Sequence, residues 1–206
     1  MPPVAPGAAR GRRDRDLARV RFRRALTLML MTLALPGSAQ LAASKPSLAA
    51  DMMAARIATA KYVDNLGKAK ADGYGIITKM IPNMGYHFLN PKVTKFDVRR
   101  PAILVYEHHG SKFQLGALEW VFPSIPAKPP LPGAKYGVFG AACHYIDGTF
   151  VFQTDQTKCA AKSPQTGAKF NFWHPRLVTL HFWVWYPNPH GVYSGINPNV
   201  HGFNAG

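Results

Sequence analysis

A nearly continuous run of hydrophobic positions lies near the end of the chain, over residues 177–186. Nearly every side chain in it is β-branched, aromatic or aliphatic, and Pro175 and Pro187 bound it. This pattern predicts a central strand that is buried on both faces. Alternation along the strand places Thr179 and His181 on one face with two tryptophans. A histidine inside such a strand needs a partner, because an unpaired buried polar group costs about 1–3 kcal/mol.

Further hydrophobic segments predict the rest of a mostly antiparallel sheet. Turn residues separate them in pairs, including an Asp-Gly sequence at 147–148 that is typical of a β-hairpin. The proline-rich residues 123–132 are expected to form an ordered loop without regular structure. The segments are 74–81, 86–89, 101–107, 112–122, 136–145 and 149–154.

The hairpin of residues 101–122 carries a buried acidic position. If Glu107 pairs with Lys112, Glu119 falls on the face that carries Leu104 and Tyr106. Either face of the second strand is mostly hydrophobic. We therefore expect the carboxylate of Glu119 to be at least half buried.

A helical pattern covers residues 47–72. Ser47 is a suitable N-cap, and Gly73 supplies the left-handed geometry that ends a helix. Hydrophobic positions form an approximate stripe along one side. The predicted fold class is α+β: an N-terminal helix packed on a mostly antiparallel β-sheet, with one disulfide.

The first 39 residues have the pattern of a signal peptide. Arginines precede a short hydrophobic run at 25–35, and small residues follow it. We expect cleavage after Ala39 (with Ala42 or Ala43 as alternatives), a flexible lead over residues 40–46 and one globular domain over 47–206. The run is about half a membrane span, so a transmembrane anchor is the weaker interpretation. The basic region is long, and translation that begins at Val20 would leave a signal of ordinary size. General secretion fits better than twin-arginine export, so the protein is predicted to be secreted or periplasmic.

The positive charge falls when the predicted signal is removed. The chain has a formal net charge of +15, and residues 1–39 carry eight arginines and two aspartates, which leaves +15 − (8 − 2) = +9. The remaining lysines are scattered, which favours a solvated surface and argues against a nucleic-acid partner. A small molecule or an envelope polymer remains as a candidate partner. The oligomeric state is not predicted.

Cys143 and Cys159 are the only two cysteines of the chain. A disulfide between them is the expected state in an exported protein. A thiolate metal site or a redox pair is the alternative, but the spacing matches neither motif.

The candidate chemistry is a group of histidines and glutamates in predicted strands. The only two glutamates of the chain, Glu107 and Glu119, lie in one hairpin. We predict that His87, Glu119 and His181 converge on a divalent metal. Two imidazoles and a carboxylate suit zinc, iron(II) or copper and leave positions open for water or substrate. His144 is an extra or substitute ligand.

Further roles follow from the same hypothesis. Glu107 is predicted as a catalytic base or as a carboxylate that orients a ligand. His174 is expected to border the cleft, and Trp120 and Trp173 to stack on a ligand. The alternative is a non-catalytic binding or envelope-associated module, in which the histidines and glutamates form a structural hydrogen-bond network. Whether the protein is an enzyme stays open at this point.

An ordered set of short motifs resembles a family of uncharacterised secreted bacterial proteins over about residues 55–203. The resemblance implies export and one compact domain, and it implies no catalytic activity. It includes a cysteine between the helix and the Met-Gly turn that this chain lacks, so the pair Cys143 and Cys159 is a separate arrangement. The motifs are Met84-Gly85-Tyr86-His87-Phe88, Leu104-Val105-Tyr106-Glu107, Glu119-Trp120-Val121, Leu180-His181-Phe182-Trp183 and the Asn-Pro pairs at 188–189 and 197–198.

Overall fold

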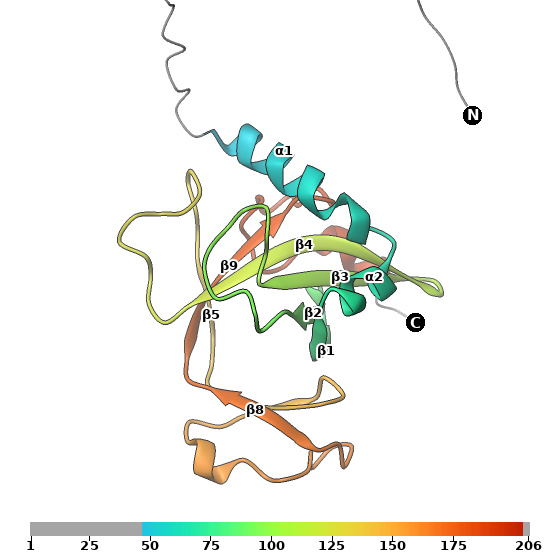
Figure 1. Cartoon of the computed structure of the whole chain (residues 1–206), viewed down its shortest axis with the longest axis vertical. Coiled ribbons are helices and arrows are strands. Elements are labelled where there is room, and N and C mark those ends of the chain that lie inside the picture. The colour runs from blue at the N-terminus through green and yellow to red at the C-terminus, as the bar shows by residue number, and fades with distance from the viewer. Residues whose placement is uncertain (1–46, 204–206) are drawn as a thin grey trace, which may run out of the picture. The chain divides into compact units, whose positions relative to one another are not determined.

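The computed structural model of the chain describes residues 47–203. Within them, a helical region is followed by nine strands in two antiparallel sheets (Figure 1). The helical elements are α1 (Leu48–Thr59), the 3-10 turn η1 (Ala60–Tyr62), α2 (Leu66–Ala71), and the later 3-10 turns η2 (Gln156–Lys158) and η3 (Pro198–Phe203). The strands are β1 (Gly75–Ile81), β2 (Gly85–Leu89), β3 (Ile103–His109), β4 (Lys112–Phe122), β5 (Gly137–Phe139), β6 (Ala142–Tyr145), β7 (Phe150–Phe152), β8 (Phe170–His174) and β9 (Leu177–Trp183). The predicted α+β class is confirmed.

The larger sheet has six strands in the order β1-β2-β3-β4-β9-β5, and the smaller has three in the order β7-β6-β8. Strand β9 lies between β4 and β5, so the predicted central strand is an interior strand. The predicted segment 136–145 is divided: β5 joins the larger sheet and β6 the smaller. The Asp-Gly turn between β6 and β7 is confirmed, with Gly148 at φ +82°.

The helical region is broken where a single helix was expected. Ser47 caps α1 by accepting a hydrogen bond from the Ala50 amide (3.2 Å), as predicted. The chain then leaves the α-helix after Thr59, and Asn65 caps α2 by accepting from the Lys68 amide (2.8 Å). The carbonyls released at the break bond to the sheet, because Tyr62 O accepts from the Tyr106 hydroxyl and Val63 O from the Leu115 amide.

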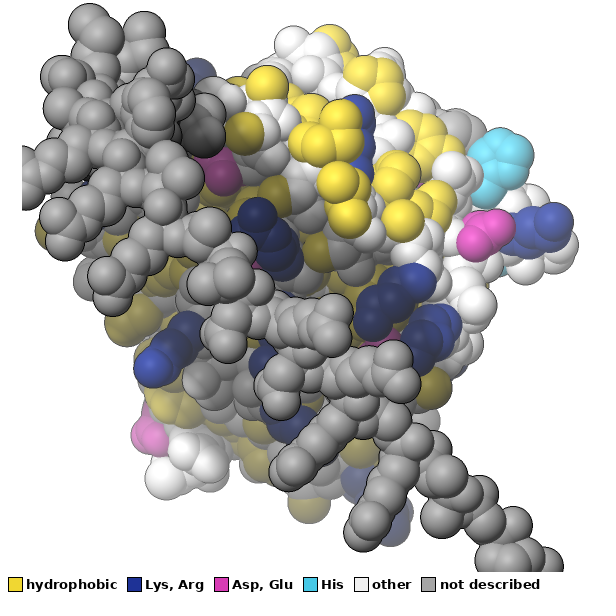
Figure 2. All heavy atoms as spheres, turned by 45° about the horizontal axis from the view of Figure 1, so that its top comes forward, with side chains coloured by type: hydrophobic (Ala, Val, Ile, Leu, Met, Phe, Trp, Pro, Cys, Tyr) yellow, Lys and Arg dark blue, Asp and Glu magenta, His cyan; other side chains and the backbone are white. Residues whose placement is uncertain are grey.

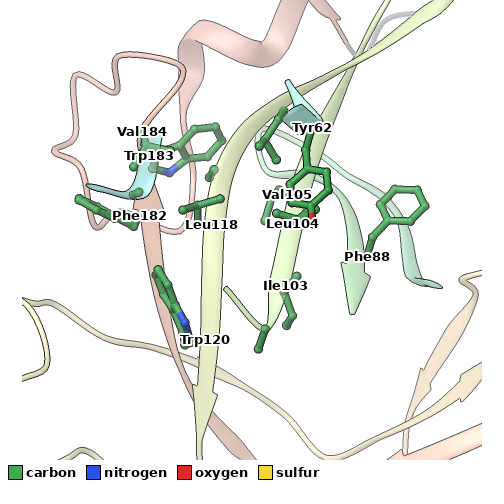
Figure 3. Close-up of a cluster of buried hydrophobic side chains, with 14 of the residues drawn as sticks. Tyr62, Phe88, Ile103, Leu104, Val105, Leu118, Trp120, Phe182, Trp183 and Val184 are labelled. Atoms are coloured by element: carbon green, nitrogen blue, oxygen red, sulfur yellow. The ribbon is translucent and has the colours of Figure 1, made fainter. Parts of the chain in front are cut away.

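The helices and the smaller sheet lie on opposite sides of the larger sheet (Figure 1). Alternate residues of the central strands point toward the helices and form the core, including Leu104, Leu118, Trp120 and Phe182 (Figure 3). The intervening residues point the other way, toward the smaller sheet. One face of the larger sheet packs against the helices, and the other carries buried hydrophobic residues such as Ile103 and Val105 beside the polar residues of the site.

The β3–β4 hairpin has a different register from the predicted one, and its strands stay paired closer to the turn. Glu107 pairs with Gln114, and His109 pairs with Lys112. An irregularity on β4 shifts the pairing between Val105 and Tyr106. Glu119 consequently lies opposite Ile103, on the face away from Leu104, so the predicted face is wrong. The predicted burial is confirmed, because Glu119 is buried.

The smaller sheet is attached to β1 by three polar contacts. The Lys79 amide donates to Gly148 O (2.7 Å), and the Lys79 ammonium lies 3.2 Å from Asp147. The imidazole of His144 lies 2.7 Å from Ile77 O. These contacts hold β6 in front of the site-bearing face of the larger sheet.

The predicted disulfide joins Cys143 on β6 to Cys159, with 5.7 Å between the Cα atoms. We expect the double variant C143A/C159A to lose about 3 kcal/mol of unfolding free energy, because the crosslink removes conformations from the unfolded chain. Urea denaturation of the variant and the parent protein without reductant measures this loss. A reductant should bring the parent close to the variant and leave the variant unchanged; equal stability of the two oxidised proteins would contradict the prediction.

Within residues 47–203 no helix is long and apolar enough to cross a membrane. The predicted signal peptide, its cleavage site and the lead at 40–46 lie outside the described residues. On the visible described surface in Figure 2, Lys and Arg side chains are scattered among hydrophobic and other side chains.

Candidate metal centre

Three polar side chains meet on the face of the larger sheet that looks away from the helices. Glu119 on β4 is directly opposite His181 on β9, and His87 comes from β2. Each of them is flanked in sequence by large hydrophobic residues that turn to the core. The strict alternation of a strand therefore turns these three polar side chains to one side.

The three side chains are close enough to share one ion. One ligand atom from each of His87, Glu119 and His181 lies within 4.8 Å of the other two. His181 Nε2 lies 3.0 Å from Glu119 Oε1, and His87 Nε2 lies 3.5 Å from Glu119 Oε2. Donors bound at about 2.0–2.1 Å to one tetrahedral ion lie about 3.3 Å apart. The observed separations bracket that value, so the predicted convergence is confirmed as a group that could hold a metal.

The group is buried, with 4%, 5% and 3% of His87, Glu119 and His181 exposed. Burial lowers the pKa of His87 to about 4, because the charged imidazolium is poorly solvated there. Burial acts to raise the pKa of Glu119, but the neighbouring His181 and His87 outweigh it and the net shift is downward. The site therefore presents a neutral imidazole and an ionised carboxylate at neutral pH, which are the forms that bind metals.

Thr78 on β1 fixes the ring of His87. Its Oγ1 lies 2.7 Å from His87 Nδ1 and also accepts the backbone amide of His87 (3.2 Å). When Nδ1 carries the hydrogen and donates it to Thr78, Nε2 presents its lone pair to Glu119 and His181. This is the arrangement in which an outer partner orients a metal-binding histidine.

We expect Thr78→Val to weaken metal binding about 10- to 100-fold, because it keeps the shape of the side chain and removes the acceptor for Nδ1. Titration of chelator-treated protein with Zn²⁺ measures the change. Thr179→Val is the matched control, since Thr179 lines the same cavity and is not a member of the three-residue group. An unchanged affinity in Thr78→Val would show that the hydroxyl does not orient the ligand.

His181 has one polar atom without a partner. Its Nδ1 is buried, and within the described residues it has no hydrogen-bond partner. A buried polar atom left in this way costs about 1–3 kcal/mol. A purely structural network of hydrogen bonds is expected to satisfy both nitrogens of its histidines, so this cost favours a functional role for the ring.

A cavity of about 170 Å³ opens beside the three side chains. It lies between the two sheets, since its lining includes residues of β1, β2, β4 and β9 as well as His144, Phe172 and His174 of the smaller sheet. Most of the lining is hydrophobic, for example Ile103, Val121 and Phe139. The polar group therefore faces a small apolar space.

The other predicted site residues lie outside the three-residue group. His144 lines the cavity but is not a member of the three-residue group; its Nε2 lies 3.0 Å from His174 Nε2. The expectation that His174 borders the cleft is confirmed. Glu107 is fully buried beside Gly85 and Gly116 and does not line the cavity. Its role as a base or orienting carboxylate stays a prediction.

The two predicted stacking residues differ in exposure. Trp120 is 2% exposed and packs in the core, with its ring 4.9 Å from that of Phe96. It cannot serve as an exposed platform, because alternation along β4 turns it to the helix side when Glu119 faces the cavity. Trp173 is half-buried and donates from Nε1 to Gln153 O (2.8 Å). Stacking by Trp173 stays a prediction.

Two features of the site had weak signals in the sequence. Thr78 is one threonine in an ordinary strand pattern, and nothing local indicates that it contacts a histidine nine residues later. The contact between His144 and His174 depends on the register of β6 and β8, and β7, η2 and a long loop lie between these two strands in the sequence. The hydrophobic flanks of both histidines were the only available signal.

In the metal-free protein we expect stability to fall as the pH falls from about 6.5 to 4. Burial lowers the pKa of both His87 and His144 to about 4, so in this window the unfolded chain binds protons that the folded chain does not. Each of the two histidines should remove about 2 kcal/mol between pH 7 and pH 5. The lowered pKa of Glu119 acts in the same direction below its ordinary value.

Urea denaturation of chelator-treated protein at pH 7, 6 and 5 measures this dependence. His87→Gln removes one titrating group and should flatten the profile by about half. A stability that is constant from pH 7 to pH 5 would contradict the burial of neutral imidazoles.

Comparisons of this chain with protein-family models, with curated proteins and with solved structures found no match.

Proposed function

We propose that this is an exported metalloprotein that binds one divalent transition metal through His87, Glu119 and His181. The observation that carries the proposal is the convergence of one ligand atom from each residue, all within 4.8 Å of one another, on a buried face. The ligands come from three different strands. Strands of one sheet hold their side chains rigidly, so the group is organised before the ion binds.

The donor set favours zinc, iron(II) or copper. Two imidazole nitrogens and one carboxylate oxygen suit these ions, whereas magnesium and calcium prefer oxygen ligands alone. Three protein ligands leave at least one position for water or substrate. This incomplete coordination is typical of catalytic and not of structural zinc sites.

The cavity supports a small apolar substrate. Its volume of about 170 Å³ is similar to that of an engineered apolar cavity of about 150 Å³ that binds benzene. A metal at the group would present its open positions toward this space. We propose metal-dependent chemistry on a small molecule whose body is apolar and whose reacting group is a metal ligand.

Export is supported by two independent features. The disulfide Cys143–Cys159 fits an oxidising compartment. The basic, hydrophobic and small-residue pattern of the first 39 residues fits a signal peptide.

A second candidate function is a non-catalytic module in which the same residues are a structural network. The observation that favours it is that Glu119 lies close to both imidazoles and so can accept from each without an ion. In that case the cavity alone binds a ligand. The two candidates differ in whether the folded protein takes up metal.

Elemental analysis tests the proposal on protein purified from the periplasm or medium of cells that produce the full chain, without chelators. We expect about one zinc, iron or copper ion per chain at the three-residue group. Protein that is folded and monodisperse, carries no such ion and takes up none from added Zn²⁺, Fe²⁺ or Cu²⁺ would overturn the proposal in favour of the structural network.

A further inference from the structure

The second pair of histidines faces the same cavity from the smaller sheet. His144 on β6 and His174 at the end of β8 lie diagonally across neighbouring strands, since His144 pairs with Phe172 and Ala142 with His174. Their Nε2 atoms are 3.0 Å apart. The ring of His144 is stacked on that of Phe172 at 4.6 Å between centroids, which fixes its orientation.

The partners of the other ring nitrogens determine the tautomers. His144 Nδ1 lies 2.7 Å from Ile77 O, and His174 Nδ1 lies 2.6 Å from Pro175 O. A carbonyl oxygen only accepts hydrogen bonds, so each Nδ1 must carry a hydrogen and donate it. In the neutral rings both Nε2 atoms are then acceptors. Two acceptors 3.0 Å apart repel each other unless they share a cation, which is either a proton or a metal ion.

A proton shared by the two Nε2 atoms is disfavoured at this position. Burial lowers the pKa of His144 to about 4 and also lowers the pKa of His174. Within residues 47–203 no carboxylate is hydrogen-bonded or ion-paired to either ring, in contrast to Glu119 beside His181. The aromatic surroundings, which include Phe139 and Phe172, offer an imidazolium only a weak cation–π contact in place of its lost water.

We infer that His144 and His174 form a second metal-binding position, on the wall of the cavity opposite the group of His87, Glu119 and His181. The ligands are the two Nε2 atoms, and their separation is close to the roughly 3.3 Å expected for two donors on one tetrahedral ion at 2.0–2.1 Å. The remaining positions face the cavity. The inference uses a different pair of side chains and does not rest on the proposed function.

The donor chemistry selects the ion. With imidazole nitrogens alone, the site suits copper, zinc or nickel and not magnesium or calcium. The backbone carbonyls of Ile77 and Pro175 act as the outer partners that fix tautomer and ring orientation. A ligand in the cavity could then contact an ion on each wall. The class of ligand that fits is therefore a small molecule with two metal-binding atoms or with one atom that bridges the two ions.

The test is a Zn²⁺ titration of chelator-treated protein purified from cells that produce the full chain, followed by calorimetry and by ¹⁵N NMR of the histidine rings. We expect two ions per chain in the parent protein and one in His174→Phe, which retains an aromatic ring at this half-buried position. The Nε2 resonances of His144 and His174 should shift on saturation, and their Nδ1 atoms should stay protonated. His108→Phe, at a half-buried position near the end of β3 that does not line the cavity, is the control and should still bind two ions.

The outcomes separate this inference from the proposed function. Two ions in the parent and one in both His174→Phe and His181→Gln support both. A single ion that is lost in His174→Phe but kept in His181→Gln supports the second site alone. A single ion that is lost in His181→Gln, with unchanged His144 and His174 resonances, overturns the second site. Three protonated nitrogens among the four of the His144–His174 pair at neutral pH, with resonances unchanged after zinc is added, would also overturn it.

Discussion

Replacement of His181 by Ala or Gln is expected to weaken metal binding at the three-residue group by more than about 100-fold. The change removes a direct ligand, and even the loss of an outer partner costs about 10- to 100-fold. Gln at this position can still donate to Glu119, which lies 3.0 Å from the present imidazole, so it limits the cost of an unpaired buried carboxylate. Isothermal titration with Zn²⁺ in the His174→Phe background measures this site alone.

Thermal stability gives a second readout of the same prediction. A metal that binds only the folded chain adds about 4 kcal/mol at a free concentration 1,000 times its Kd, which raises the Tm of a domain of this size by about 8–16 °C. His181→Gln should lose most of this gain. His190→Ala is the control, because His190 lies in an exposed turn. An equal gain in His181→Gln and in the parent would contradict the ligand assignment.

Replacement of Gly85 by Ala is expected to cost about 4 kcal/mol of unfolding free energy. Gly85 has φ +108°, and a Cβ there would lie 2.5 Å from Tyr106 O and 2.6 Å from Glu107 Oε1. The unusual backbone angle costs about 1–3 kcal/mol, and the forced movement of buried atoms costs about 1–3 kcal/mol more. Because Gly85 is two residues before His87, the strand that carries this ligand should also be displaced.

The matched control is Gly110→Ala. Gly110 also has a positive φ (+59°), but nothing lies within 4 Å of an added Cβ. This variant should lose only about 1–2 kcal/mol from the left-handed backbone. Urea denaturation compares the two variants, and a loss in Gly85→Ala no larger than that in Gly110→Ala would show that the backbone at β2 is less constrained than the contacts indicate.

The sequence predicted those parts of the site that depend on local pattern. Hydrophobic flanks around His87, Glu119 and His181 indicated buried strands, and period-two alternation then requires each polar side chain to leave the core. The disulfide followed from having two cysteines and an expected oxidising compartment. The burial of Glu119 followed in either register, because both faces of its strand are hydrophobic.

The features that were not predicted depend on tertiary contacts. The predicted face for Glu119 was wrong because an irregularity on β4 changes the pairing of β3 and β4. A shift of one residue moves a side chain to the other face of a sheet. The same register explains why Trp120 is buried: it follows Glu119 on β4 and therefore points to the opposite face, into the core. The helix break after Thr59 is held by bonds from Tyr106 and Leu115, which are far away in the sequence.

The most direct measurement is an anomalous-scattering map from crystals of the protein grown with Zn²⁺. We predict a peak about 2.0–2.2 Å from Nε2 of His87, Nε2 of His181 and a carboxylate oxygen of Glu119. A map with no peak between these atoms, in crystals where both imidazoles still contact the Glu119 carboxylate directly, would contradict the metal centre.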